Sequence, residues 1–405
     1  MTETFPIHSL RISRDEHQRR CLNLLSFLYS NNLTGLVIFD NINILYFTGF
    51  AFIPTERPIV FLMNADGEKG MYVPRLEVEH AQVETGIERV HFYAEYPGNT
   101  HPAAGLKQML EEMGMLLPDG RLGADHDGYP WLFGYEGPTL SAQTDMEIVN
   151  VQGQINQLQA IKSQAELHLI QESCKWGHLA HVLLQKYTAV GLTETEVSLR
   201  ASHEATLAMM DTIGPLYRSQ SMWGNGPSAN YRGQIGRNAA IPHALANNIT
   251  FQPGDVLVTG AGCPLWSYNS ELERTRFVGE PSPAQQEMFH HAKTAQEIAF
   301  SAMKPGRMCS EVDTAVRTYY DQNNLMPHWK HHAGHAIGLR YHEGPFLDTG
   351  DQTVLQAGMV FTVEPGFYAP NLGGFRHSDT VAITNDGIQL MTYYPRDWHS
   401  LVIPI

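Results

Sequence analysis

The chain has 405 residues, a formal net charge of −15, and 43% hydrophobic and 17% charged residues. This composition is typical of a globular protein, and the length favours two domains over a single hydrophobic core. The acidic balance argues against nucleic-acid binding, which requires a basic surface along the phosphates.

The location of the protein is constrained by what the sequence lacks. Met1–Pro6 has neither a basic nor an apolar segment, so we expect no signal peptide. No apolar run reaches the roughly 18 residues of a membrane-spanning helix, so we expect no membrane partner. Four cysteines are scattered along the chain: Cys21, Cys174, Cys263 and Cys309. Their lack of metal or redox spacing favours free thiols and a cytoplasmic protein.

The first part of the chain predicts a smaller N-terminal domain over residues 1–157. Gly35–Phe39 is an apolar run typical of a buried strand, and a turn signal ends the run Ile42–Gly49. Pro58–Met63 predicts another strand. Asp119–Tyr129 is polar and glycine-rich without apolar periodicity, so we expect a loop there.

The second part, residues 158–405, begins with a helix signal. Ser163-x-x-Glu166 is a capping-box signature, in which each side chain satisfies a free backbone donor of the other residue. Further helix starts are predicted at Thr193-x-x-Glu196, Ser282-Pro283 and Ser310-x-x-Asp313. Strand-like runs lie at Asp255–Thr259, Val360–Val363 and Thr380–Thr384. Helices followed by strands favour an α+β fold with an antiparallel sheet.

Candidate chemistry concentrates in Tyr268–Thr275. This stretch contains Glu271 and Glu273, which a strand places on the same face. Arg274 follows them and can pair with one of the two acids. Glu364 ends an apolar run, where partial burial would suit a catalytic base.

These positions resemble the metal-site pattern of the creatinase, aminopeptidase P and prolidase superfamily, the pita-bread hydrolases. Metal-dependent members carry an Asp, a second Asp eleven residues later, a Gly-His, a Glu-Pro and a final Glu. The corresponding residues here are Gly260, Glu271, His335, Glu364 and Ser378. Asn43–Phe50 and the segment around Ser163 also resemble this superfamily. The resemblance implies a creatinase-like N-terminal domain and a pita-bread catalytic domain.

Two of the five metal positions have changed. A two-metal site needs several carboxylates to bridge ions about 3.5–4 Å apart. Gly260 has no side-chain donor, and Ser378 is a poor substitute for a bridging carboxylate. We therefore expect no metal cofactor. The alternative is a single divalent ion held by Glu271, His335 and Glu364, with an open coordination position.

The run Leu272–Thr275 resembles the metal-free creatinase branch. Without a metal, hydrolysis needs a carboxylate base or nucleophile, and Glu273 and Glu364 are the two candidates. Both could also clamp a cationic amidine or guanidine group. His243 lies eleven residues before Gly254, a spacing similar to that of the superfamily's substrate-side histidine. We expect it to protonate the leaving nitrogen, with a surface-loop histidine as the alternative.

The remaining expectations concern substrate and subunits. The residues that the resemblance places around a substrate are Arg57, Tyr268, His335, His342, Glu271 and His377. Arg57-Pro58 resembles the Arg-Pro by which creatinase-like dimers reach the neighbouring site, so we expect a homodimer; a surface salt bridge is the alternative. For His342, a structural hydrogen bond is equally open.

These observations predict a homodimeric cytoplasmic hydrolase that cleaves a non-peptide C–N bond. The expected substrate is a small zwitterion with an amidine, guanidino or ureido group. Glu271 stands where creatinase has a small residue, which argues against creatine itself. One alternative is a metal-dependent Xaa-Pro dipeptidase with a degenerate metal site. The other is a non-catalytic family member that serves as a binding protein.

Overall fold

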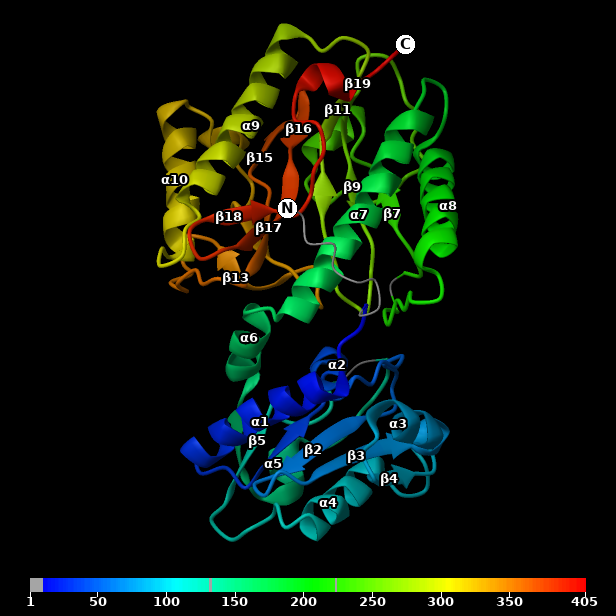
Figure 1. Cartoon of the computed structure of the whole chain (residues 1–405), viewed down its shortest axis with the longest axis vertical. Coiled ribbons are helices and arrows are strands. Elements are labelled where there is room, and N and C mark those ends of the chain that lie inside the picture. Colours follow the sequence, from blue (N-terminus) through cyan, green and yellow to red (C-terminus); the bar gives the residue numbers. More distant parts are fainter. Residues whose placement is uncertain (1–9, 131–132, 223) are drawn as a thin grey trace. The chain divides into compact units, whose positions relative to one another are not determined.

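The computed structural model describes residues 10–130, 133–222 and 224–405 of the chain. It contains two compact units, one over Ile12–Gln159 and one built mainly from Ala160–Ile405 (Figure 1). The start of the chain, for which no signal peptide was expected, lies outside the described residues. Within the described ranges, no helix is long and apolar enough to cross a membrane. The predicted domain boundary between residues 157 and 158 stays a prediction.

The N-terminal unit is a six-stranded mixed sheet between helices (Figure 1). Its strands are β1 (Gly35–Ile38), β2 (Val60–Asn64), β3 (Lys69–Pro74), β4 (Arg89–Tyr93), β5 (Arg121–Ala124) and β6 (Glu147–Asn150). The helices up to residue 160 are α1 (Arg14–Ser30), α2 (Asn41–Thr48), α3 (Val78–Thr85), α4 (Pro102–Glu112), α5 (Leu140–Thr144) and α6 (Gln152–Ala160). The sheet order is β4-β3-β2-β1-β5-β6, with β2 antiparallel to both of its neighbours.

The predicted loop over Asp119–Tyr129 is wrong in its first half, where strand β5 forms. This strand pairs in parallel with both β1 and β6. Leu122 is fully buried, and a Cβ at Gly123 would meet the side chain of Leu36 at 2.7 Å. A parallel strand covered on both faces shows no alternation of polar and apolar residues, so its sequence carries no strand periodicity.

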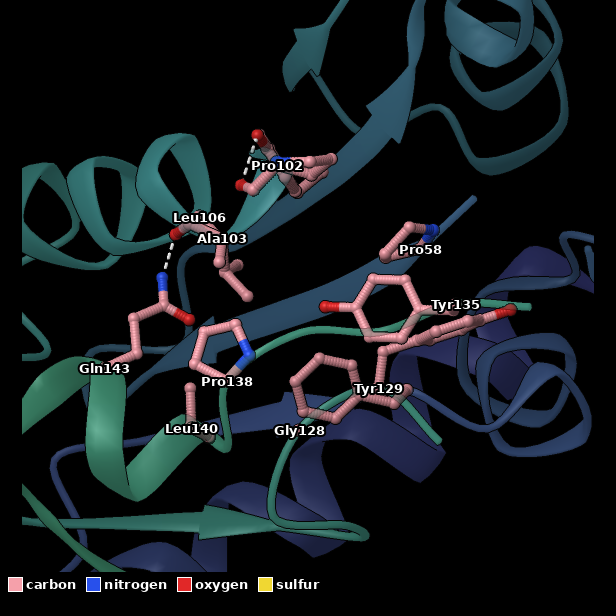
Figure 2. Close-up of a pocket in the computed structure, with 12 residues that line it drawn as sticks. Pro58, Pro102, Ala103, Leu106, Gly128, Tyr129, Tyr135, Pro138, Leu140 and Gln143 are labelled. Carbon is pink, nitrogen blue, oxygen red and sulfur yellow. Dashed lines mark hydrogen bonds between the residues drawn. The ribbon is translucent and has the colours of Figure 1, made fainter. Parts of the chain in front are cut away.

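Tyrosines line a small pocket in this unit (Figure 2). Figure 2 shows the rings of Tyr129 and Tyr135 beside Pro138. Tyr72 also lines the pocket, and its hydroxyl donates to the carbonyl of Pro102 at 2.8 Å. The free volume is about 10 Å³, which is room for about one water molecule. The pocket is therefore a packing defect of the core and is too small for a substrate.

The second unit is built on an eight-stranded sheet. Its helices are α7 (Gln164–Tyr187), α8 (Glu194–Ile213), α9 (Pro283–Ala302) and α10 (Cys309–Gln322). Its strands are β7 (Ser228–Asn230), β8 (Val256–Val258), β9 (Gly260–Gly262), β10 (Leu272–Glu273), β11 (Thr275–Val278), β12 (Gly334–Ala336), β13 (Glu343–Leu347), β14 (Val360–Val363), β15 (Gly366–Ala369), β16 (Gly373–Arg376), β17 (Ser378–Ile383), β18 (Ile388–Leu390) and β19 (Val402–Ile403).

The large sheet runs β13-β12-β14-β17-β10-β9-β7, with β18 paired to β17, and each of these pairs is antiparallel. Figure 1 shows α7 and α8 beside β7 and β9, with α9 and α10 beside β15. The predicted α+β class with an antiparallel sheet is confirmed.

The helix starts follow their capping residues in three cases of four. Ser163 and Ser282 both form full capping boxes, and Thr193 accepts from the amide of the third residue after it. The predicted cap at Ser310 is wrong, because α10 already begins one residue earlier. Asp313 is buried and has a different task there, since it accepts a hydrogen bond from the Ala333 amide at 2.9 Å.

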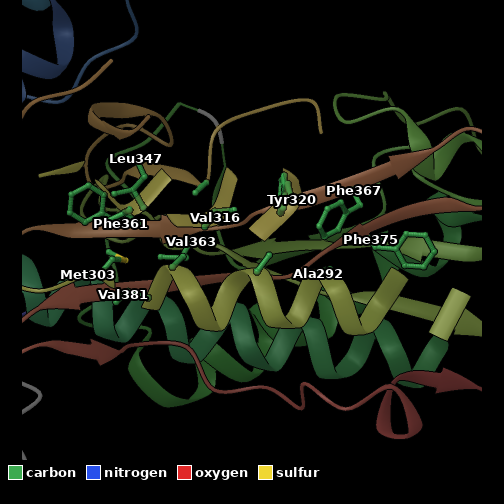
Figure 3. Packing of buried hydrophobic residues seen from close by; sticks show 14 of the residues in the cluster. Ala292, Met303, Val316, Tyr320, Leu347, Phe361, Val363, Phe367, Phe375 and Val381 are labelled. Carbon is green, nitrogen blue, oxygen red and sulfur yellow. The ribbon is translucent and has the colours of Figure 1, made fainter. Parts of the chain in front are cut away.

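The core of the second unit lies between α9 and the strands. Small residues on α9 allow the helix to approach the sheet closely, and in Figure 3 Ala292 and Val363 lie at the contact. Phe361 and Val381 are fully buried in the same cluster. Burying each large apolar side chain contributes about 1.5–3 kcal/mol. Strands β14 and β17, which carry residues of the candidate site, therefore rest on a well-packed core.

Candidate active site

Three candidate ligands converge on one face of the large sheet. Glu271 directly precedes β10, His335 lies in β12, and Glu364 directly follows β14. One ligand atom from each of them lies within 4.8 Å of the other two. Strands β10, β17, β14 and β12 are consecutive in the sheet, so strand order brings together residues up to 93 positions apart in sequence, as from Glu271 to Glu364. We call these residues the acid trio.

His335 is oriented as a ligand by its own strand. Its Nδ1 lies 2.9 Å from the carbonyl of Ala336, which assigns a proton to Nδ1 and makes Nε2 the nitrogen that can bind an ion when its own proton is displaced. Nε2 lies 3.3 Å from Glu364 Oε1 and has no hydrogen bond among the described residues. Burial alone lowers the pKa of His335, but Glu364 and Glu271 outweigh it and raise that pKa to about 9. The site therefore attracts a cation.

A glycine makes this position possible. Gly334 has φ +159°, and a Cβ there would lie 2.1 Å from the carbonyl oxygen of Thr362. Any side chain at that position would push β12 away from β14. The close approach of the two strands sets His335 beside Glu364.

The two carboxylates of the trio have different surroundings. Burial, followed by the charges of Glu364 and Glu273, raises the pKa of Glu271 to about 7. Ser378 Oγ donates to Glu271 Oε1 at 2.7 Å. Burial alone raises the pKa of Glu364, but His335 and Arg376 outweigh it and hold that pKa below its usual range. At neutral pH the negative charge of the two carboxylates in the trio is therefore only partly balanced by the neighbouring positive groups.

Glu273 lies next to the trio and is bound by two arginines. Arg376 donates through Nε to Oε2 at 2.5 Å and through Nη2 to Oε1 at 2.9 Å. Arg232 also donates to Oε1 through Nη2. Glu273 is 1% exposed, so this pairing holds a buried carboxylate. Its predicted role as a base stays a prediction. We call Glu273, Arg376 and Arg232 the arginine cluster.

Arg274 does not pair with either acid, contrary to the expectation. Its guanidinium donates to Asp379 Oδ1 at 2.9 Å. Successive residues of a strand point to opposite faces, so the residue after Glu273 faces away from it.

Two further histidines lie near the trio. The ring of His342 stacks on His335 with 3.9 Å between centroids. Burial, then the charge of His335, lowers the pKa of His342 to about 4, and His243 contributes in the same direction. His243 itself is exposed on the loop after β7. The carbonyl of Pro242, the residue before it, accepts from Arg376 Nη1 at 3.5 Å, so this loop reaches the arginine that binds Glu273, while the role of His243 as a proton donor stays a prediction.

Three other predicted substrate residues have partners or positions of their own. Tyr268 is buried and donates to Glu166 Oε1 at 2.6 Å, at the start of α7. His377 packs edge-on against Phe289 of α9, and within the described ranges neither ring nitrogen has a hydrogen-bond partner. Arg57, in the N-terminal unit, forms ion pairs with two neighbouring glutamates. Their substrate-binding roles stay predictions.

Sequence reasoning missed Arg232, Arg376 and the buried acid that positions the loop after Arg232. Glu194, at the start of α8, is 2% exposed. It accepts hydrogen bonds from the amides of Gly233 and Asn247 at 2.8 Å and of Ile249 at 3.3 Å. One carboxylate thus closes the loop that follows Arg232 and carries His243. The one signal in the sequence was Gly260 itself, because a glycine at the position of a metal-binding Asp leaves space for a side chain from elsewhere in the chain.

Comparison with known proteins matches both parts of the chain. Residues 168–385 match the sequence model of metallopeptidase family M24, and residues 20–161 match the creatinase/prolidase N-terminal domain. The Xaa-Pro dipeptidase of Pyrococcus furiosus is 28% identical over 381 residues, which cover 94% of this chain and 99% of that protein.

Solved structures share the fold. The prolidase from Pyrococcus horikoshii OT3 is similar with a TM-score of 0.77 and 26% identity, over 94% of this chain and 99% of that one. The zinc-substituted Escherichia coli aminopeptidase P in complex with product has a TM-score of 0.70 and 20% identity, over 94% and 95% of the two chains. This second likeness concerns the fold alone.

These findings correct two expectations. The matched family is one of metallopeptidases and the matched relatives are Xaa-Pro dipeptidases, so the expected cleavage of a non-peptide C–N bond is wrong. The expected absence of a metal cofactor is wrong for the same reason, and the acid trio agrees with a divalent ion. Counting the lost ligands at Gly260 and Ser378 gave no information on how closely the other three converge.

Proposed function

The chain belongs to metallopeptidase family M24, and on that premise we propose that it is a Xaa-Pro dipeptidase that works with a single divalent metal ion. The observation that carries this proposal is the convergence of Glu271, His335 and Glu364 to within 4.8 Å. The similarity of this chain to the P. furiosus Xaa-Pro dipeptidase, along almost the whole of both chains, supports the substrate class.

The donor set fits such an ion. Two carboxylates and one imidazole are the ligand types that zinc binds in catalytic sites with an open position. Nε2 of His335 has no hydrogen-bond partner among the described residues, and Glu271 accepts at Oε1 from the hydroxyl of Ser378. A divalent ion held there would supply Lewis-acid polarisation of the scissile carbonyl. Gly260 and Ser378 leave no comparable set for a second ion.

The chain's own residues would bind the substrate and move protons. Cleavage before proline releases a secondary amine, which must take up a proton as it leaves. His243 is exposed on a loop whose Pro242 carbonyl accepts from Arg376, and a histidine is suited to proton transfer near neutral pH. We assign it this role. His342, stacked on His335, keeps that ring in place.

The proposal includes a homodimer, because Arg57-Pro58 resembles the segment by which related dimers reach the neighbouring site. Light scattering on the purified protein tests the dimer. Mixing Arg57→Ala chains with His243→Ala chains tests the shared site, because hybrid dimers would contain one intact composite site. If activity stays absent after verified subunit exchange, the shared site is ruled out.

The function itself is tested by metal content and by paired substrates. We expect elemental analysis to find one divalent ion per chain after reconstitution with Mn²⁺ or Zn²⁺. Ala-Pro and Leu-Pro should be cleaved, whereas Ala-Ala and N-acetyl-proline should be poor substrates. A chelator should abolish the activity and the ion should restore it. Absence of both a bound ion and Xaa-Pro cleavage would exclude the proposed function.

A further inference from the structure

The place next to Gly260 is filled by a guanidinium group. A Cβ built on this glycine would lie 3.5 Å from Arg232 Cζ and 3.6 Å from both its Nε and Nη2. Apart from the chain neighbours, the three heavy atoms nearest to that position all belong to Arg232. These are ordinary van der Waals distances, so the guanidinium lies where a longer side chain at position 260 would extend.

The backbone aims Arg232 at this place. Its φ is +51°, and Gly233 after it has φ +73°. A non-glycine residue in the left-handed region is strained, and such strain persists only where the surroundings fix it. Here the Gly233 amide is bound by the buried Glu194, which fixes the turn. The strained conformation is therefore a built feature of the loop.

Glu273 holds the guanidinium from the other side. The antiparallel register pairs Leu272 with Ala261, so one step along the ladder sets Glu273 opposite Gly260. Glu273 binds Arg232 while its side chain is 1% exposed, and the side chain of Arg232 is 40% exposed. The hydrogen bonds of Arg232 with described side chains all run through Nη2, and its Nε is buried without a partner. The positive group thus faces the open side of the sheet above a buried anion.

The charges of the site favour one additional ion over two. The site has three carboxylates, Glu271, Glu273 and Glu364, and two guanidinium groups, Arg232 and Arg376, which leaves one net negative charge once His335 has lost its proton to bind an ion. One divalent ion reverses this to one net positive charge, and a second would raise it to three. Like charges this close in a partly buried site repel strongly.

We propose that the guanidinium of Arg232 is a built-in cation that takes the place of a second divalent ion, so that this active site binds one ion only. This rests on the proposed function, because it takes the acid trio as the place of the first ion. Arg232 is thus a positioning residue, which fixes a positive charge beside the ion-binding trio and keeps a further cation out.

A four-protein cycle read by ion content tests this. The proteins are the wild type, Gly260→Asp, Arg232→Gln, and the double variant. Each is saturated with Zn²⁺, freed of excess ion by gel filtration, and analysed for zinc per chain. We expect one, one, one and two ions. In Gly260→Asp the introduced carboxylate pairs with Arg232. In the double variant it is free to bind Zn²⁺ together with Glu271 and the released oxygen of Glu273.

Two controls separate charge from volume. Arg232→Lys combined with Gly260→Asp keeps the positive charge and should stay at one ion. Arg237→Gln combined with Gly260→Asp removes an exposed arginine five residues away and should also stay at one. Thermal unfolding of each protein verifies that the ion counts refer to folded chains. Gly260→Asp is expected to fold, because the atom nearest to the new Cβ lies at 3.5 Å, an ordinary van der Waals distance, and belongs to the side chain of Arg232.

The outcomes distinguish this inference from the proposed function. Two ions in the wild type or in Gly260→Asp would overturn the inference, as would one ion in the folded double variant. If the wild type binds no ion, the proposed function fails. The inference is then decided by the difference between the double variant and Gly260→Asp, where one extra ion supports it and no difference overturns it.

Discussion

The acid trio and the arginine cluster each take one glutamate from the same short segment, Glu271 and Glu273, yet these two carboxylates are neutralised in different ways. Glu273 is bound by two guanidinium groups that belong to the chain. Glu271 has a serine hydroxyl on Oε1, and the neighbouring carboxylates together with burial raise its pKa to about 7. In the arginine cluster the positive charges are side chains of the protein. The acid trio lacks such charges on Glu271 and would be neutralised by a bound ion. The difference separates an acid that the chain neutralises itself from one that remains available to an ion.

The largest effect is expected where the exchangeable cation binds. His335→Ala removes one of three ligands, so the protein should no longer retain a stoichiometric ion. Loss of Lewis-acid stabilisation, worth several kcal/mol, corresponds to a decrease of about 10³–10⁴-fold in kcat/KM. Zinc analysis and steady-state kinetics measure both. His332→Ala, a neighbouring histidine outside the trio, is the matched control and should retain its ion. A retained ion in His335→Ala would show that the trio is not the metal site.

The next effect concerns stability and opposes two adjacent acids. Glu273→Gln removes the nearest counter-charge of the buried Arg376 and leaves it only Glu364 at 3.7 Å, which should lower the free energy of unfolding by about 3–5 kcal/mol. Glu271→Gln should change it by less than about 1 kcal/mol in the metal-free protein, because burial and neighbouring carboxylates already disfavour the charge of Glu271. Urea denaturation of the two metal-free variants measures the contrast. Equal losses of unfolding free energy in the two variants would show that Glu273 and Glu271 do not differ in their contribution to the fold.

A smaller effect is expected from the proton donor. His243→Ala should lower kcat for Xaa-Pro dipeptides by about 10²-fold, the lower end for a general acid, because the side chain is exposed. Zinc content and unfolding midpoint should not change. An analogue with a leaving group that needs no proton should be cleaved by the variant nearly as fast as by the wild type. A comparable loss on both substrates would point to binding instead of proton transfer.

The smallest effect is expected at Ser378. Its hydroxyl orients Glu271 through a 2.7 Å hydrogen bond, and losing such a supporting contact typically weakens metal affinity by about tenfold. Calorimetric titration of Ser378→Ala with Zn²⁺ measures this. The control is Thr384→Ala, which follows the opposite end of β17 and removes an exposed hydrogen bond to Asp386. Complete loss of the ion in Ser378→Ala would show that the serine is itself a ligand.

The parts of the fold that could be predicted have local causes. The predicted capping box at Ser163 and the predicted helix start at Ser282-Pro283 each depend on at most four consecutive residues, and the structure forms both. The members of the acid trio were named from a motif, although their convergence to 4.8 Å depends on the order of four strands. That convergence is what the expectation of a metal-free protein lacked.

The arginine cluster had no signal of this kind. Glu273 is separated from Arg376 by 103 residues and from Arg232 by 41, so the pairings arise only when the sheet forms. Arg274, adjacent in sequence, was the obvious partner and faces the other side of the strand. The left-handed conformation of Arg232 is set by Glu194, a buried acid at the start of α8.

That buried acid has a consequence for how this enzyme can vary. Glu194 binds the amides of Gly233 and Asn247, which bracket the segment that carries His243 and directly follows Arg232. Glu194 therefore positions Arg232 and His243 together, although the role proposed for Arg232 concerns an ion and the role proposed for His243 concerns the leaving group. In a deep mutational scan, substitutions at Glu194 should mimic the combined phenotype of Arg232 and His243 variants, and a compensating change at either residue alone should not rescue them.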